Sequence, residues 1–161
     1  MFSAPARRTL AAASFPHALK LNRQATGRGL SKQAWGIVPK IREIDTLLCD
    51  NRALRGMLRE SHPELCFWTL NGKQAMQYNK KKREGQQERL LVLEHYFPQC
   101  HALFEQVCGE FLRRQVARDD IIDAMVCAVT AKSGYGGYRT APVSPTRDGQ
   151  GLPMEIVYCK P

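Results

Sequence analysis

The chain has 161 residues, which is enough for one ordinary domain and short for two. Hydrophobic residues make up 43% and charged residues 24%, and these values exclude a disordered, collagen-like or disulfide-dense protein. No stretch approaches the roughly 18 consecutive apolar residues that a membrane-spanning helix requires. We therefore expect a single soluble domain over residues 1–161, with no membrane partner.

The net charge of +9 is concentrated near the amino terminus. Residues 1–42 contain eight Lys or Arg and no acid, whereas residues 43–161 carry the other sixteen against all fifteen acids. A basic surface attracts phosphates through long-range electrostatics and counterion release. The charge distribution therefore makes nucleic acid a candidate partner.

The amino-terminal segment has features of a targeting sequence. Residues 7–13 (RRTLAAA) resemble a transit peptide or a twin-arginine leader, but Pro16 and His17 interrupt the apolar run. We therefore expect residues 1–30 to belong to the protein body as a basic, irregular lead-in. Residues 22–31 have the composition of a loop that ends at Ser31, which is a suitable N-cap for a helix.

An amphipathic helix is predicted after Ser31, because apolar residues recur there at spacings of three or four. Pro39 marks a kink or a restart within this helix, and Asp50 is suited to cap a short helical turn over residues 51–55. The stripe consists of Trp35, Val38, Ile41, Ile44 and Leu48.

The middle of the chain alternates short elements. Residues 56–62 show the weak alternation of a strand, and Pro63 suits the first position of a helix through Leu70, which Asn71 and Gly72 close. Two further helices are predicted over residues 84–96 and 103–116. No clear strand is predicted between Gly72 and Arg118.

The carboxyl-terminal part begins with a helix that is apolar nearly all round and is therefore expected in the core. It starts near Asp119 and runs to Ala131, and a Gly, Pro and Tyr-rich loop follows over residues 134–151. Residues 154–158 predict a terminal strand.

Acidic residues at the start of this helix are the main candidate site. Asp120 and Asp123 are three residues apart, so their carboxylates emerge on one face roughly 5–6 Å apart, which favours a cation between them. Glu60 and Glu64 form a second acidic pair, and a carboxylate at a strand end beside acids on a helix is a common magnesium site. In the alternative interpretation, Asp119 is the N-cap and Asp120 only interacts with the helix dipole.

Four blocks of the chain carry a resemblance to a known family. They are residues 30–45 (LSKQAWGIVPKIREID), 59–68 (RESHPELCFW), 119–124 (DDIIDA) and 151–156 (GLPMEI). These blocks resemble the bacterial family called domain of unknown function 429, which is described as predicted RNase H-like nucleases. They occur in the order of that family and span nearly the whole chain.

The resemblance implies an α/β, RNase H-like fold and a two-metal hydrolysis of phosphodiesters, with Mg²⁺ or Mn²⁺ as cofactor. By this resemblance Glu60, Asp120 and Asp123 are the catalytic acids, and these three residues with Glu64 hold the metal. The basic run Lys80, Lys81, Lys82 and Arg83 is then a candidate contact for the nucleic-acid backbone. A basic run alone is also typical of a solvated surface.

The chain departs from the family pattern at its amino terminus. The resemblance covers the carboxyl-terminal two thirds of a family member, and the strands that would supply the first catalytic aspartate are missing. We therefore expect a helix-dominated, incomplete fold with two or three strands and weak or no nuclease activity. An unpaired sheet edge would favour a homo-oligomer.

Two classes of function besides the nuclease remain open. The first is a non-catalytic helical module that binds nucleic acid or another partner. A small-molecule enzyme that uses Cys66 or His62 is a third interpretation, although no Cys, His and acid constellation is recognisable from spacing. The cysteines show no C-x-x-C pair, and we expect them to be small buried residues of a cytoplasmic protein; they are Cys49, Cys66, Cys100, Cys108, Cys127 and Cys159.

Overall fold

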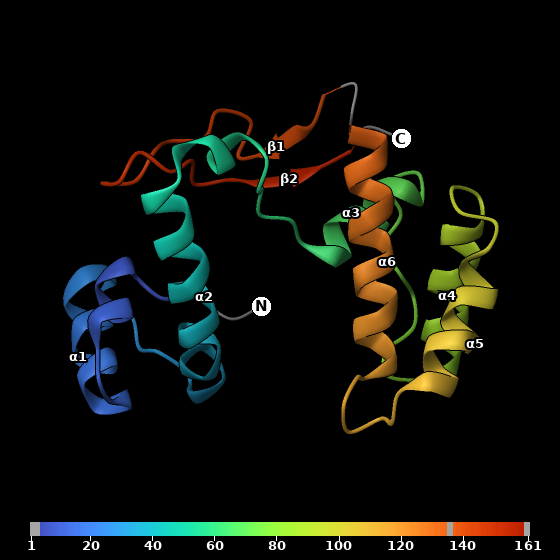
Figure 1. Ribbon diagram of the computed structural model, residues 1–161, viewed down its shortest axis with the longest axis horizontal. Helices are drawn as coiled ribbons and strands as arrows, with labels where there is room; N and C mark the ends of the chain where they lie inside the picture. The colour runs from blue at the N-terminus through green and yellow to red at the C-terminus, as the bar shows by residue number, and fades with distance from the viewer. Residues whose placement is uncertain (1–3, 135–136, 160–161) are drawn as a thin grey trace. The chain divides into compact units, whose positions relative to one another are not determined.

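The computed structural model describes residues 4–134 and 137–159. The chain divides into two compact units, Met1–Leu58 and Arg59–Pro161. Figure 1 shows the helices of both units and the strands β1 and β2. Each unit is described by itself. No helix of the described chain is long and apolar enough to cross a bilayer.

In residues 4–58, the described part of the first unit, the secondary structure is entirely helical. Its elements are the 3-10 helix η1 (Arg7–Ala11), α1 (Phe15–Thr26), α2 (Lys32–Asp50) and the 3-10 helix η2 (Arg52–Gly56). The small core consists of Ala12, Ala18, Leu30 and Ala34, against which Leu19, Leu21 and Trp35 pack.

Helix α1 corrects the expectation of an irregular lead-in over residues 1–30 and of a loop over residues 22–31. Ser14 caps the helix by accepting a hydrogen bond from the amide of His17, and Gly27 ends it with a φ of 70°. Asn22, which suggested a loop, is buried inside α1. Its side chain accepts from the Ala6 amide at 2.9 Å and donates to the Arg28 carbonyl at 3.0 Å. Tertiary hydrogen bonds thus stabilise a helix that the local composition did not predict.

Helix α2 confirms the predicted cap, because Ser31 Oγ accepts the Ala34 amide at 3.0 Å. The helix continues through Pro39 to Asp50. The next turn is capped by Asn51, whose side chain accepts from the Ala53 amide, and the expectation of an Asp50 cap was wrong. Part of the apolar stripe packs inward at Val38, but Ile44 is half exposed.

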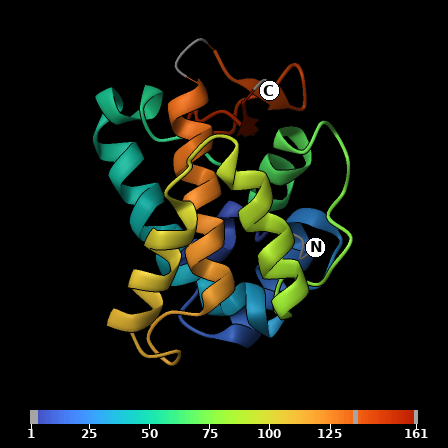
Figure 2. The same ribbon diagram turned by 90° about the vertical axis from the view of Figure 1, so that its right-hand side faces the viewer.

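The second unit places four helices around a common core. They are α3 (Pro63–Leu70), α4 (Arg83–Glu94), α5 (Cys100–Glu110) and α6 (Arg118–Ser133). Helix α6 contacts each of the other three and supplies Ile122 and Val126 to the core, as predicted for a helix that is apolar nearly all round. Figure 2 shows α4 and α6 with their amino-terminal ends at the same end of the unit.

Three of these helices lie within three residues of their predicted bounds, whereas the helix predicted over residues 103–116 begins at Cys100 and ends at Glu110. The Leu112 amide then bonds to the Gln115 side chain, so a polar turn replaces the last predicted helical turn. Asp119 is not the N-cap of α6, since Ala117 occupies that position.

The sheet is small. Strand β1 (Arg139–Ala141), which lies in the predicted loop, pairs antiparallel with β2 (Ile156–Tyr158), with Thr140 opposite Val157. The strand predicted over residues 56–62 is reduced to a bridge between Ser61 and Val157, in which the Val157 amide donates to the Glu60 carbonyl at 2.7 Å. The fold is therefore helix-dominated with two antiparallel strands in the described chain, in agreement with the coarse prediction.

Candidate functional site

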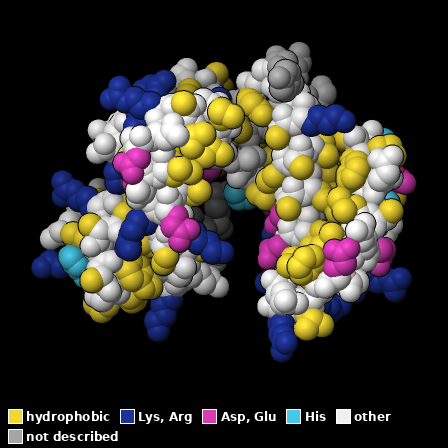
Figure 3. Space-filling model, viewed as in Figure 1, with side chains coloured by type: hydrophobic (Ala, Val, Ile, Leu, Met, Phe, Trp, Pro, Cys, Tyr) yellow, Lys and Arg dark blue, Asp and Glu magenta, His cyan; other side chains and the backbone are white. Residues whose placement is uncertain are grey.

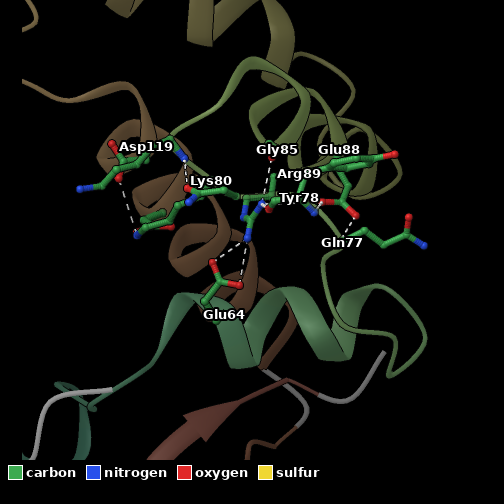
Figure 4. A network of polar contacts seen from close by, with 11 residues as sticks. Glu64, Gln77, Tyr78, Lys80, Gly85, Glu88, Arg89 and Asp119 are labelled. Carbon is green, nitrogen blue, oxygen red and sulfur yellow. Dashed lines mark hydrogen bonds and ion pairs between the residues drawn. The ribbon is translucent and has the colours of Figure 1, made fainter.

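Lys80 lies between the two acids of α6 that face the loop before α4. Its Nζ is 2.5 Å from Asp123 Oδ2 and 3.9 Å from Asp119 Oδ2. Asp119 and Asp123 are four residues apart on the helix, which places them on the same face. In the view of Figure 4, Lys80 lies between Asp119 and the pair formed by Arg89 and Glu64. The acids that share a cation here are therefore Asp119 and Asp123, not the predicted pair Asp120 and Asp123, and the cation is a lysine ammonium.

The contact with Lys80 does not fully offset the cost of burying the Asp123 carboxylate. Desolvation raises the pKa of Asp123, and the hydrogen bond and charge of Lys80 only partly oppose that rise. For Lys80, burial works to lower the pKa, but Asp123, Asp119 and Glu64 outweigh it, so the pKa is raised. Asp123 Oδ1 is buried and has no hydrogen-bond partner among residues 4–134 and 137–159. One carboxylate oxygen is therefore left with an unused capacity to accept a donor or a cation.

The raised pKa of Asp123 predicts how stability changes with pH. Because the folded state binds this proton more tightly than the unfolded chain, the contribution of Asp123 to stability falls as the pH rises above the ordinary pKa of 3.8 and through the raised value. Replacing Asp123 with Asn removes this cost, and Lys80, which is one-third exposed, can turn to water.

We therefore expect Asp123→Asn to be as stable as the native protein at pH 7, or more stable by on the order of 1 kcal/mol. Urea unfolding between pH 4 and pH 8 measures this, and the advantage should vanish toward pH 4. Asp120→Asn, at an exposed position, serves as the control and should change little. A clear loss of stability in Asp123→Asn at pH 7 would show that the Lys80 pair outweighs the desolvation of Asp123.

Glu64 is engaged by a buried arginine. Arg89 Nη2 donates to both carboxylate oxygens of Glu64, at 2.8 and 3.0 Å, and the Arg89 side chain is only 4% exposed. Arg89 Nη1 donates to the carbonyls of Tyr78 and Gly85. This network joins α3, α4 and the loop before α4, so Glu64 has a structural partner where the sequence predicted a metal (Figure 4).

The remaining predicted acids lie outside this network. Asp120 is exposed, and its side chain has no hydrogen bond or ion pair among the residues that the structure describes. Desolvation raises the pKa of the Glu60 carboxyl group, and the charge of His62 opposes this rise only in part. Within residues 4–134 and 137–159, no group of three or more His, Cys, Asp or Glu side chains is arranged to hold a metal ion.

A cleft of about 710 Å³ opens beside Asp119, among α4, α5 and the start of α6. Four cations line it, and none of their side chains forms a hydrogen bond or ion pair within the described chain; they are Lys81, Arg83, Arg113 and Arg118. The acids in the lining are Glu105 and Asp119, and Asp119 also faces Lys80. We call this feature the basic cleft.

Two helices begin at the basic cleft. Helices α4 and α6 have no side-chain cap at Lys82 and Ala117, so their first amides add positive potential at this end of the unit. Figure 3 shows Lys and Arg side chains at the lower end of this unit, where Figure 1 places the loop between α5 and α6.

The residues of the predicted basic run therefore lie in different surroundings. Lys80 pairs with acids of α6, Lys81 and Arg83 line the basic cleft, and Lys82 is the exposed N-cap of α4 outside its lining. Sequence reasoning missed Arg113 and Arg118, which lie apart from the run. Their signal was the surplus of arginine between the two final helices, RRQVAR over residues 113–118, without an acid.

The Cys66 and Cys127 thiols lie in surroundings that disfavour reactivity. Cys66 is fully buried, with its Sγ 3.1 Å from Ser61 Oγ. Desolvation, with smaller effects of Cys66 and Asp123, raises the pKa of Cys127 to about 11. All six cysteines are free thiols, and three of them are buried. A thiolate is the reactive form, so these surroundings disfavour the interpretation as a cysteine enzyme.

Comparison with known proteins gives one positive result. No curated protein and no solved structure matches the chain. A family model described as protein of unknown function (DUF429) matches residues 1–147, which is most of the chain and includes the acids of α6 and every residue that lines the basic cleft. The chain therefore belongs to the DUF429 family.

Proposed function

We propose that the second unit binds the phosphate backbone of a nucleic acid in the basic cleft. The observation that supports this most directly is the set of four cations around one hollow, none of which is paired within the described residues. Cations in folded proteins tend to be paired or dispersed, because concentrating like charge raises the energy of the folded state. A polyanion that neutralises them would recover that energy and release its counterions.

The side chains that carry the positive charge in the basic cleft are also of a type that binds phosphate well. Three of the four are arginines, whose planar guanidinium groups bind phosphate oxygens in a bidentate manner. The lining acid that belongs to α6, Asp119, lies 3.9 Å from the Lys80 ammonium, which reduces its repulsion of a bound anion. The second lining acid, Glu105, is exposed to solvent and is therefore screened.

The test is a fluorescence anisotropy titration with a labelled single-stranded oligonucleotide at several salt concentrations, with EDTA present. We expect Arg113→Gln/Arg118→Gln to weaken binding at least tenfold at low salt and to reduce the slope of log K against log salt by about 1.4, because about 0.7 is lost per phosphate contact.

A double variant of equal charge in the first unit, Arg23→Gln/Arg28→Gln, is the matched control, since both residues are exposed there. If this control weakens binding as much as the cleft variant, attraction is due to net charge and the basic cleft is not the site. If the native chain binds no oligonucleotide at low salt, the proposal is wrong.

The second candidate function is the nuclease that the resemblance implies, with Glu60, Asp120 and Asp123 as catalytic acids. One observation favours it: Asp119 lines the basic cleft and shares Lys80 with Asp123, whose Oδ1 accepts no hydrogen bond within the described residues. Carboxylate oxygens suit Mg²⁺ or Mn²⁺, which would have to displace the Lys80 ammonium and supply Lewis-acid activation of water.

Calorimetric titration with Mn²⁺ tests this second function. Native protein, Asp123→Asn and Lys80→Met should be compared, because loss of the lysine leaves the acid pair open to an ion. Metal binding that rises in Lys80→Met and disappears in Asp123→Asn supports the nuclease. A Mn²⁺ affinity that neither substitution changes counts against the nuclease and leaves the basic cleft as a non-catalytic site.

A further inference from the structure

The shape of the basic cleft restricts the kind of nucleic acid that fits it. At about 710 Å³ it has the size of a pocket for a single small ligand and not of a groove that follows a double helix. A duplex presents its phosphates on a convex surface and keeps its bases paired inside. A strand with unpaired bases can insert one nucleotide into a pocket of this size.

The lining has two chemically different parts. The cations form the rim, whereas Leu90 and Phe104 form a buried apolar floor from α4 and α5, with exposures of 3% and 5%. His101, half-buried on α5, contributes a second flat ring. Gln86 and Gln87 add two amide side chains on α4. An inorganic polyanion would use the rim alone and would make no use of His101 or of the two amides.

We infer that the basic cleft takes one unpaired nucleotide of a single-stranded nucleic acid, with its phosphate on the arginine rim and its base against His101 and the apolar floor. This inference rests on the proposed function and adds the strandedness of the ligand. Aromatic and histidine rings stack on bases without regard to sequence, and the glutamine amides offer donors and acceptors to the base edge. The site is therefore selective for unpaired bases and tolerant of their identity.

The test compares three probes of similar charge: a labelled single-stranded oligonucleotide, the duplex of the same sequence, and inorganic polyphosphate as competitor. We expect the single strand to bind about tenfold more tightly than the duplex. His101→Ala should remove most of that difference and leave the affinity for polyphosphate unchanged, because the rim keeps its charge. His101→Phe, which keeps a flat ring, should restore single-strand binding and shows that the position tolerates substitution.

His95→Ala is the matched control, because His95 is exposed at the end of α4 and does not line the basic cleft. Equal binding of single strand and duplex, or single-strand binding indifferent to His101→Ala, would overturn the inference while the arginine variants still weaken binding. If no probe binds, the proposed function fails as well. Adenosine monophosphate as a further competitor separates a free nucleotide from a strand: competition at low micromolar concentration would mean that the ligand is the free nucleotide, which would also overturn it.

Discussion

Replacing Arg89 with methionine is expected to lower the free energy of unfolding by about 3 kcal/mol or more. Methionine retains much of the apolar stem but removes every donor of the guanidinium group. The Tyr78 and Gly85 carbonyls each lose a charged donor, and the two hydrogen bonds from Nη2 to the Glu64 carboxylate disappear. The guanidinium carbon also lies 5.6 Å from the centre of the Phe67 ring, so a cation–π contact is lost.

The loss is large because the Arg89 side chain is almost fully buried, where an unsatisfied carbonyl regains little from water. Urea unfolding followed by circular dichroism measures the difference. Glu64→Gln is the informative control: its side chain is 42% exposed and the amide oxygen can still accept from Arg89, so at most about 1 kcal/mol should be lost.

If Arg89→Met were no more destabilising than Glu64→Gln, the two carbonyl contacts of Arg89 would contribute nothing and the loop before α4 would be fixed by other groups. The expected result also bears on the metal hypothesis. Both oxygens of Glu64 are used by Arg89, so a metal at Glu64 would have to displace a structural partner at the cost predicted here.

Local signals in the sequence were sufficient for much of the helical structure. Ser31 predicted the start of α2 through its side-chain cap, and Pro63 predicted the start of α3 at its first position. The apolar run after Asp119 predicted α6 and its burial. These signals act within a few residues, so they can be recognised without knowing the rest of the fold.

Long-range partners could not be predicted in the same way. Lys80 and Asp123 are 43 residues apart, and Arg89 and Glu64 are 25 apart. Nothing in a basic run distinguishes the one lysine that pairs from its neighbours. The predicted acid pair was Asp120 and Asp123, whereas the structure pairs Asp119 with Asp123 around Lys80. Spacings of three and four residues both place side chains on one helix face, so the sequence alone could not distinguish the two pairs.

Replacing Gly85 with alanine is expected to destabilise the protein by about 1–3 kcal/mol and to move Lys80 away from Asp123. A Cβ at this position would lie 2.2 Å from the Asn79 carbonyl oxygen and 3.0 Å from the Lys80 amide nitrogen. Both atoms belong to the backbone, so no side-chain rotation can relieve the overlap. The loop that presents Lys80 to α6 must therefore shift as a whole.

Helix propensity works in the opposite direction, which makes the prediction specific. Alanine in a helix is favoured over glycine by roughly 1 kcal/mol, so a glycine without close neighbours should gain stability on the same substitution. Gly36 in α2 has nothing within 4 Å of a built Cβ and provides that control. We expect Gly36→Ala to raise the midpoint of urea unfolding and Gly85→Ala to lower it.

The consequence of Gly85→Ala should extend to the basic cleft, because Lys81 lies in the same loop as Lys80 and lines the cleft. Single-strand binding in Gly85→Ala should weaken although no charge has been removed, and its salt slope should fall toward that of a variant lacking Lys81 alone. If Gly85→Ala gained stability as Gly36→Ala is expected to do, the loop would not be packed on α4 as closely as the Asn79 contact requires, and the placement of Lys80 beside Asp123 would have to be revised with it.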